Sequence, residues 1–270
     1  MAKLLIGYDV EAMDERTDRF LKKAMQVHAE LRSPASMFIV GKTLERNAEQ
    51  CRKAAEEGWL EFHQHTYSHV LLKTVVQENE EGIQVFPGVS FEQAKADILQ
   101  GQKALKDILG ISCTGLTAPY NYYRGLGDRL DLLEVLRECG IKIIRSAGRN
   151  ERDWQPVPLQ WQPYFYAPQG YPELLECPLH GWQDCIAREQ LGWENVAGYV
   201  EWLKRDIDEA VRLDLDFVYC SHDWSSLACD PELTHIRAMI AYAKERGMEL
   251  MSYSDYYAFK TSQAASISQE

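Results

Sequence analysis

Short apolar runs alternate with longer segments of helical periodicity along the whole chain. In the helical segments apolar residues recur every three or four positions, as at Phe20, Ala24, Val27 and Leu31, which predicts amphipathic helices. The short runs are rich in apolar and β-branched residues, which predicts strands. The predicted strands comprise residues 3–9, 35–40, 59–64, 111–116, 141–146, 174–179, 216–222 and 248–253.

Local signals also mark helix ends. Ser90 and Gln93 fit a capping box, in which two side chains bind free backbone amides at a helix start. Asp230 followed by Pro231 predicts another helix start. Gly110 follows a helical segment and precedes a predicted strand, so we expect it to end that helix with a positive φ.

Strands that alternate with helices predict a parallel sheet covered by helices. No GxGxxG motif follows the first strand, so an α/β fold of the (β/α) barrel type, with seven to eight parallel strands, is favoured over a dinucleotide-binding fold. We expect one barrel domain over residues 1–260 and a flexible tail over 261–270. Two long connections, about 70–90 and 147–173, interrupt the pattern, and loops of that length usually carry function.

Composition excludes several classes of partner. Acidic residues outnumber basic ones 41 to 29 without any basic cluster, which argues against nucleic acid and anionic membrane surfaces. No apolar stretch reaches the roughly 18 residues of a membrane span, and the run 4–6 is too short for a signal peptide. The seven cysteines form no close CxxC pair, as in proteins of a reducing compartment, so we expect a cytoplasmic protein. The oligomeric state is not indicated.

Two carboxylates stand at the end of the first predicted strand. In a (β/α) barrel, catalytic residues gather at the C-terminal ends of the strands. Asp9 and Glu11 are two residues apart, so strand alternation turns both to one side while Val10 packs the other way. They predict a polar site, or else they cap the helix that starts near Asp14.

Three histidines mark the end of the third predicted strand: His63, His65 and His69. His65 and His69 are four apart, so one helical turn would present both on one face, as two ligands to one metal ion require. Solvated loop histidines are the alternative. Because His65 and His69 lie at the end of a strand, where catalytic residues of a barrel gather, the interpretation as metal ligands is favoured.

Further polar and aromatic residues lie in the second half of the chain. His222 ends the seventh predicted strand, where it could act in a site or simply pack in the core. The long connection 147–173 contains four aromatic residues that suit sugar rings or pack the loop, namely Trp161, Tyr164, Phe165 and Tyr166.

Taken in order, these segments resemble the NodB-type polysaccharide deacetylase family (carbohydrate esterase family four) over about residues 4–253. HTYSH (65–69) matches the metal-binding motif of that family letter for letter. The other motifs are GYDVE (7–11) for the opening motif, APY (118–120) for R-x-P-Y, RDW (152–154) for the D-W motif and YCSH (219–222) for L-x-H.

The resemblance implies a distorted (β/α) barrel that binds one divalent ion, such as Zn²⁺, and removes an N-acyl group by hydrolysis. The implied substrate is an N-acetylated sugar, as a small molecule or an oligosaccharide. The implied roles are Asp9 as base, His222 as acid, Glu11, His65 and His69 as metal ligands, and Tyr120, Asp153 and Trp154 as substrate or oxyanion residues.

Two positions depart from the family motifs. Many members carry a second aspartate where this chain has Val10, and relatives with D-V-D or D-V-E indicate that Glu11 takes over as ligand. The arginine of R-x-P-Y is Thr117 here. We expect Arg124 or Arg149 to supply that positive charge, or the base to be tuned differently.

Three other functions stay open from the sequence. Some barrel relatives hydrolyse cyclic amides in the manner of allantoinases, a few of them without a metal. A non-catalytic carbohydrate-binding barrel would explain the two motif departures. Two histidines and a carboxylate also serve non-haem iron oxygenases, but those enzymes are mostly all-β and carry their ligands in another order.

Overall fold

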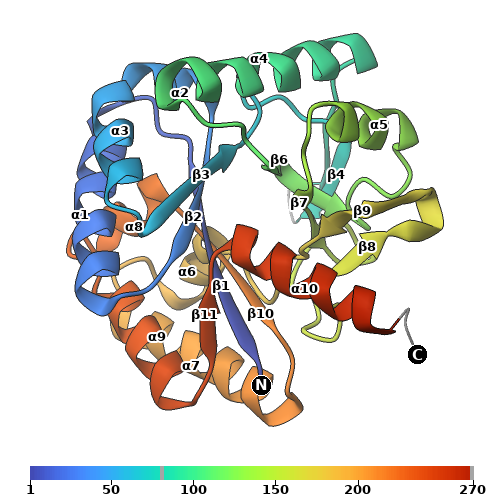
Figure 1. Cartoon of the computed structure of the whole chain (residues 1–270). Coiled ribbons are helices and arrows are strands. Elements are labelled where there is room, and N and C mark those ends of the chain that lie inside the picture. Colours follow the sequence, from blue (N-terminus) through green and yellow to red (C-terminus); the bar gives the residue numbers. More distant parts are fainter. Residues whose placement is uncertain (80–81, 268–270) are drawn as a thin grey trace.

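The computed structural model describes residues 1–79 and 82–267. Its main sheet has nine strands, and β4 and β5 form a separate hairpin. Figure 1 shows the strands of the main sheet at the centre with helices around them. The strands are β1 (Lys3–Val10), β2 (Ala35–Ile39), β3 (Leu60–Gln64), β4 (Val75–Asn79), β5 (Gly82–Phe86), β6 (Gly115–Tyr123), β7 (Ile143–Arg149), β8 (Tyr164–Tyr166), β9 (Tyr171–Glu176), β10 (Phe217–His222) and β11 (Glu249–Met251).

The helices begin and end largely at the residues that the sequence marks. Asp14 caps the first helix, and the capping box of Ser90 and Gln93 starts the fourth. Gly110 ends that helix with a φ of 71°. The helices are α1 (Glu15–Leu31), α2 (Gly41–Arg46), α3 (Ala48–Glu56), α4 (Phe91–Leu109), α5 (Leu130–Glu138), the 3-10 helix η1 (Ala167–Gln169), α6 (Asp184–Leu191), α7 (Val196–Leu213), α8 (Asp223–Cys229), α9 (Thr234–Glu245) and α10 (Tyr253–Ile267).

The main sheet is a parallel sheet that curls into an open barrel. Its order is β10-β1-β2-β3-β6-β7-β9-β8, with β11 on β1, and only the β8–β9 pairing is antiparallel. Between β9 and β10 a single backbone hydrogen bond, from His180 N–H to the carbonyl of Val218, bridges the gap at 3.1 Å, and no ladder closes it within residues 1–79 and 82–267. All eight predicted strands are present, so the predicted distorted (β/α) barrel is confirmed.

Strand alternation divides the core into two parts. On β1, Leu4 and Ile6 pack against the surrounding helices in the large outer cluster, together with Tyr8 and Val10. Leu5 points the other way into a small inner cluster. That inner cluster combines Leu5, Phe38, Ile143, Leu175, Cys177, Leu179, Val218, Cys220, Tyr253 and Tyr256. The barrel interior therefore has apolar packing at one end, which leaves its other end for polar side chains.

Some elements differ from those that the sequence predicts. The long connection 70–90 contains the β4–β5 hairpin, and the connection 147–173 contains β8. The prediction that Asp230 starts a helix is wrong: α9 begins at Thr234, because Asp230 ends α8 and its carboxylate accepts hydrogen bonds from Thr234 and His235 instead.

The C-terminal segment is helical where the sequence indicates a flexible tail. Helix α10 continues through residue 267, and residues 268–270 lie outside the described part of the chain. Tyr256 and Phe259 of this helix pack against the inner cluster, and Figure 1 shows α10 lying across the strands. The division of the chain into domains stays a prediction.

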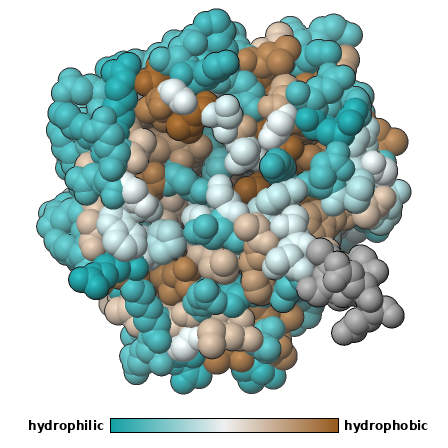
Figure 2. Space-filling view, viewed as in Figure 1, coloured by the Kyte–Doolittle hydropathy of each residue, from teal (hydrophilic) through white to brown (hydrophobic). Residues whose placement is uncertain are grey.

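One face of the molecule is mainly polar. Figure 2 shows hydrophilic residues around the rim of one face, with smaller apolar patches between them. None of the helices in the described residues is both long enough and apolar enough to cross a membrane.

Candidate active site

The C-terminal end of β1 contributes the two carboxylates that the sequence singles out. Asp9 follows Leu5 and Gly7 on the inward side of β1, and its side chain is almost fully buried. Glu11 lies just beyond the strand, and its Oε1 accepts a hydrogen bond of 2.7 Å from the indole Nε1 of Trp224. Neither residue caps α1, because Asp14 does so.

His65 and His69 meet Glu11 at this end of the barrel. The Nε2 atoms of His69 and His65 lie 2.8 Å and 3.6 Å from Glu11 Oε2, and the two rings pack edge to face at 4.8 Å between centroids. Thr66 and His69 both have positive φ values, 57° and 60°, which non-glycine residues seldom adopt. This strained backbone after β3 turns both imidazoles toward one carboxylate.

These three side chains fit a divalent metal ion. Their ligand atoms lie within 4.8 Å of one another. His65 Nδ1 lies 3.0 Å from the carbonyl of Thr117, and a carbonyl only accepts, so Nδ1 carries the hydrogen and Nε2 is free as a ligand. A ligating histidine fixed by a carbonyl and a ligating carboxylate fixed by another donor, here Trp224, are the usual outer contacts of a metal site.

Electrostatics agree with this interpretation. Burial by itself would raise the pKa of Glu11, but the neighbouring imidazoles of His65 and His69 outweigh it and hold the pKa well below the usual range. Burial lowers the pKa of His69, and the nearby Glu11 offsets only part of that change. An ionised carboxylate beside a neutral imidazole is the state in which both groups bind a metal ion.

Arg145 of β7 holds the other carboxylate. Its guanidinium donates through Nη2 to Asp9 Oδ1 and through Nε to Thr117 Oγ1, the latter at 3.0 Å. Arg145 is fully buried, and it fits because Gly7 has no side chain: a Cβ at Gly7 would lie 2.9 Å from Nη1. The positive charge thus reaches Asp9 from the strand beside Thr117.

The two arginines expected in that role lie elsewhere, so that expectation is wrong. Arg149 Nε donates to the backbone carbonyls of Tyr120 and Asn121. The guanidinium of Arg124 lies over the ring of Tyr123. Neither arginine has a described hydrogen bond or ion pair with Asp9, because strand register places position 145, not 149, opposite Thr117.

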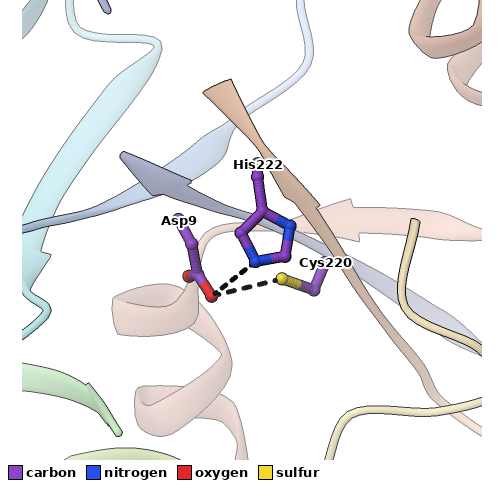
Figure 3. Close-up of side chains that lie close together, drawn as sticks. All are labelled: Asp9, Cys220 and His222. Carbon is purple, nitrogen blue, oxygen red and sulfur yellow. Dashed lines mark hydrogen bonds and ion pairs between the residues drawn. The ribbon is translucent and has the colours of Figure 1, made fainter. Parts of the chain in front are cut away.

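His222 ends β10 and faces Asp9, as Figure 3 shows. Its Nε2 lies 3.9 Å from Asp9 Oδ2, and its Nδ1 lies 2.7 Å from Asp184 Oδ1. Asp184 also accepts hydrogen bonds from the backbone N–H of His222 and from the hydroxyl groups of Ser221 and Ser225. Burial would lower the pKa of His222, but the charge of Asp184 outweighs it and raises that pKa well above the usual value.

Tyr120 lies in an irregular part of β6. The ladder with β7 skips residues 118–121, and both Tyr120 and Asn121 have positive φ values, 66° and 50°. The break frees backbone groups from the ladder at the edge of the site. Tyr120 packs against His69, with ring centroids 6.2 Å apart.

Comparison with known proteins agrees with this geometry. The sequence model described as polysaccharide deacetylase matches residues 8–144, more than half of the chain. The chain belongs to the polysaccharide deacetylase family. Members of this family are hydrolases that act on carbon–nitrogen bonds of carbohydrates, so the protein is an enzyme of the deacetylase type. No curated protein sequence gives a significant match.

Several solved structures share the fold of this chain at low sequence identity. A Mycobacterium smegmatis protein assigned as a polysaccharide deacetylase has a TM-score of 0.69 and 15% identity, with 97% of this chain and 92% of that one covered. The PuuE allantoinase has a TM-score of 0.68 and 15% identity over 95% and 88%. A family 4 carbohydrate esterase from Streptomyces lividans, solved with acetate, has a TM-score of 0.53 and 15% identity over 92% and 90%.

Most of the predicted site residues of this deacetylase line one cavity of about 330 Å³. Asp153 is the exception: its Oδ2 accepts from the backbone N–H of Val76, and the residue lines a neighbouring cavity of about 1070 Å³. Aromatic side chains of the long connection, Trp161 and Tyr164, line that larger cavity too. The predicted residues in the smaller cavity are Asp9, Glu11, His65, His69, Tyr120, Trp154 and His222.

Three further side chains of the site, those of Arg145, Trp224 and Asp184, were not predicted from the sequence. Arg145 had a visible signal, since a charged residue inside an apolar strand is rarely buried without a partner. Trp224 lies two residues after the L-x-H motif and could have been included with it. Asp184 had no signal, because it starts α6 after a long irregular connection.

The third histidine at this strand end, His63, belongs to a separate ion pair. It lies on β3 two residues before His65, deeper in the barrel, and its Nε2 is 3.0 Å from Glu61 Oε1. Burial would lower the pKa of His63, but the charge of Glu61 raises it to about 10. Burial would raise the pKa of Glu61, but the charge of His63 lowers it to about 2.

We expect Glu61→Gln to destabilise the protein by about 3 kcal/mol near pH 6, because it leaves a buried histidine without its anion. The pair stabilises the fold fully between the ordinary pKa values, 4.5 for Glu61 and 6.5 for His63. Its contribution declines as the pH rises from 6.5 towards 10 or falls from 4.5 towards 2. Urea unfolding of both proteins across this range measures the difference, which should shrink above pH 6.5 and below pH 4.5; a constant difference would contradict the ion pair.

Proposed function

We propose that this deacetylase is a metal-dependent hydrolase that removes an N-acyl group, most simply acetyl, from an amino sugar or a related small amide. One observation carries the proposal. Asp9 Oδ2 lies 3.9 Å from His65 Nε2, in the metal-binding set, and 3.9 Å from Nε2 of His222. A carboxylate that lies between the proposed metal ligands and a histidine is well placed to act as general base while the histidine acts as general acid.

Glu11, His65 and His69 would hold the metal ion. Two imidazoles and one carboxylate leave positions open for water and substrate, and zinc is the proposed ion. A divalent ion bound there supplies Lewis acidity, which polarises a carbonyl and lowers the pKa of water from about 15.7 towards 7.

Asp9 and His222 would move the protons. Asp9 takes a proton from the attacking water while the water oxygen forms a bond to the carbonyl carbon. Arg145 keeps the Asp9 carboxylate oriented and stabilises its charge until then. The carbon–nitrogen bond then breaks, and His222 Nε2 gives a proton to the nitrogen, so that a neutral amine and a carboxylic acid leave. Asp184 supports this role because it fixes the other ring nitrogen and favours the protonated imidazole.

Tyr120, Trp154 and Asp153 would bind the substrate. The backbone N–H of Tyr120 is the proposed donor to the developing oxyanion, and the irregular β6 backbone supports this because it keeps residues 118–121 out of the ladder. The half-exposed indole of Trp154 offers a face to a sugar ring. Asp153 stands at the larger cavity, where Trp161 and Tyr164 suit further sugar units.

Hydrolysis of a cyclic amide is a second candidate. The small volume of the cavity around Asp9 favours a compact substrate, and an allantoinase shares the fold. A cytoplasmic location, which we also propose, fits either small substrate, and it is supported by seven cysteines that are all unpaired in the described residues.

We expect the protein to purify with about one divalent ion per chain, and His65→Ala and His69→Ala each to abolish its retention, since each removes one of three protein ligands. His63→Gln is the matched control because it changes a histidine of the same strand end outside the metal set, so it should keep the ion. Metal analysis of the purified proteins measures this directly.

The same preparations test the substrate. Release of acetate from N-acetyl sugars, compared with ring opening of cyclic amides, separates the two candidate reactions. Full metal content in both alanine variants would refute the ligand assignment. A metal-free wild type that opens cyclic amides would favour the second candidate.

A further inference from the structure

The inner face of β10 carries a thiol beside the proposed base. Cys220 stands two residues before His222, so strand alternation turns both side chains into the barrel. Cys220 is almost fully buried, and its Sγ lies 3.5 Å from Asp9 Oδ2. Figure 3 shows Cys220, His222 and Asp9 pointing toward one another. The proposed hydrolysis gives this thiol no role.

The spacing of the three side chains is close to that around a tetrahedral metal ion. Ligand atoms about 2.0–2.3 Å from a tetrahedral ion lie roughly 3.3–3.8 Å from one another. Asp9 Oδ2 lies 3.5 Å from Cys220 Sγ and 3.9 Å from His222 Nε2, and the three ligand atoms are all within 4.8 Å of one another. We propose that Asp9, Cys220 and His222 form a second metal site, for a thiophilic divalent cation such as Zn²⁺ or Cd²⁺.

The surrounding contacts favour this set of ligand atoms. Asp184 binds Nδ1 of His222, which leaves Nε2 for the cation. Arg145 binds Oδ1 of Asp9, which leaves Oδ2. Outer contacts of this kind orient the ligands of known metal sites. A thiolate among the ligands selects zinc or cadmium over magnesium or calcium, which prefer oxygen ligands.

Cys185 is the competing thiol. It also lines the cavity and forms a third group of potential ligand atoms with Asp184 and His222. Asp184, however, already accepts hydrogen bonds from His222, Ser221 and Ser225. A cation at Cys185 would have to break that network, whereas a cation at Cys220 uses atoms that the network leaves free.

Binding at this second site would inhibit hydrolysis. It occupies Asp9 Oδ2 and His222 Nε2, the atoms that move protons in the proposed reaction. Inhibition therefore rests on the proposed function, whereas binding does not. The second cation should bind more weakly than the first, because Arg145 and the first cation both repel it.

The experiment adds Cd²⁺ to the protein that already holds its first divalent ion. We expect one further Cd²⁺ to bind per chain with an ultraviolet thiolate-to-cadmium charge-transfer band, while hydrolysis is lost. Cys220→Ala and Cys220→Ser should remove the band and leave activity without Cd²⁺ unchanged. Inhibition should then need about 100-fold more Cd²⁺, since loss of even an outer contact costs roughly 10–100-fold in metal affinity. Cys185→Ala is the matched control and should keep both effects.

Each outcome decides one part of the proposal. No band in the wild type, or a band that survives in both Cys220 variants, overturns the second site. A band lost in Cys185→Ala overturns the choice of Cys220. A Cys220-dependent band without inhibition keeps the site but removes Asp9 and His222 from the reaction, so failure of the site and failure of the proposed function are distinguished.

Discussion

Asp9→Asn is expected to keep one divalent ion bound and to slow hydrolysis roughly 10²–10⁴-fold, the usual contribution of a positioned base. Asparagine has nearly the same size as aspartate, but its amide does not take a proton from water. Metal analysis together with single-turnover rates measures both parts. Glu11→Ala is the comparison, because it removes a proposed metal ligand and should release the ion. The reverse pattern would mean that the two carboxylates exchange roles.

Arg145 provides a control for this result. Asp9→Asn leaves the buried guanidinium of Arg145 without an anion. A loss of activity in this variant could therefore reflect a destabilised barrel. The double variant Asp9→Asn with Arg145→Met removes that charge, and it should regain thermal stability while it stays inactive. If Arg145 acts only through Asp9, adding Arg145→Met to Asp9→Asn should cost no further activity, whereas Arg145→Met alone should reduce it. Recovery of turnover in the double variant would exclude Asp9 as the base.

His222→Ala is expected to slow amide hydrolysis roughly 10²–10⁴-fold while the fold and the bound metal persist. An amine must gain a proton to leave, but the leaving group of an activated ester needs none. The variant should therefore keep much more of its esterase activity than of its amidase activity. Rates on a matched amide and ester, with the melting temperature, test this expectation.

Asp184→Asn extends the test to the residue that holds His222. It keeps a polar side chain of the same size but removes the charge that favours the protonated imidazole. We expect this variant also to lose more amidase than esterase activity, but by a smaller factor than His222→Ala. Equal losses on both substrates with a lowered melting temperature would make His222 a packing residue and leave the leaving-group proton without a donor.

Two other functions stayed open from the sequence, an iron oxygenase and a non-catalytic barrel, and a different observation argues against each. The main sheet is parallel and covered by helices, unlike the all-β pattern of most non-haem iron oxygenases. A non-catalytic barrel was suggested by Val10 and Thr117. Glu11 stands with the two histidines beside Val10, and Arg145 brings a positive charge to Asp9 beside Thr117, so each departure has a substitute within the site.

The amino-acid sequence by itself determined the order of the elements and the strand ends at which the chemistry lies. All eight parallel strands, the capping box at Ser90 and the pairing of His65 with His69 follow from local periodicity and spacing, because these signals act between residues a few positions apart. The same local signals gave a wrong prediction at Asp230 and no strands in the two long connections. There the structure depends on side-chain hydrogen bonds and on strand pairing that local periodicity does not indicate.

Only the tertiary structure decided which side chains meet at the proposed base. Arg145 reaches Asp9 across 136 positions of the chain, and Asp184 reaches His222 across 38. Such contacts depend on strand register and on how the sheet curls, because parallel strands bring the ends of distant segments to one edge. Register also explains why Arg145 rather than Arg149 stands opposite Thr117, and why Cys220 lies beside Asp9. Sequence spacing carries no information on either.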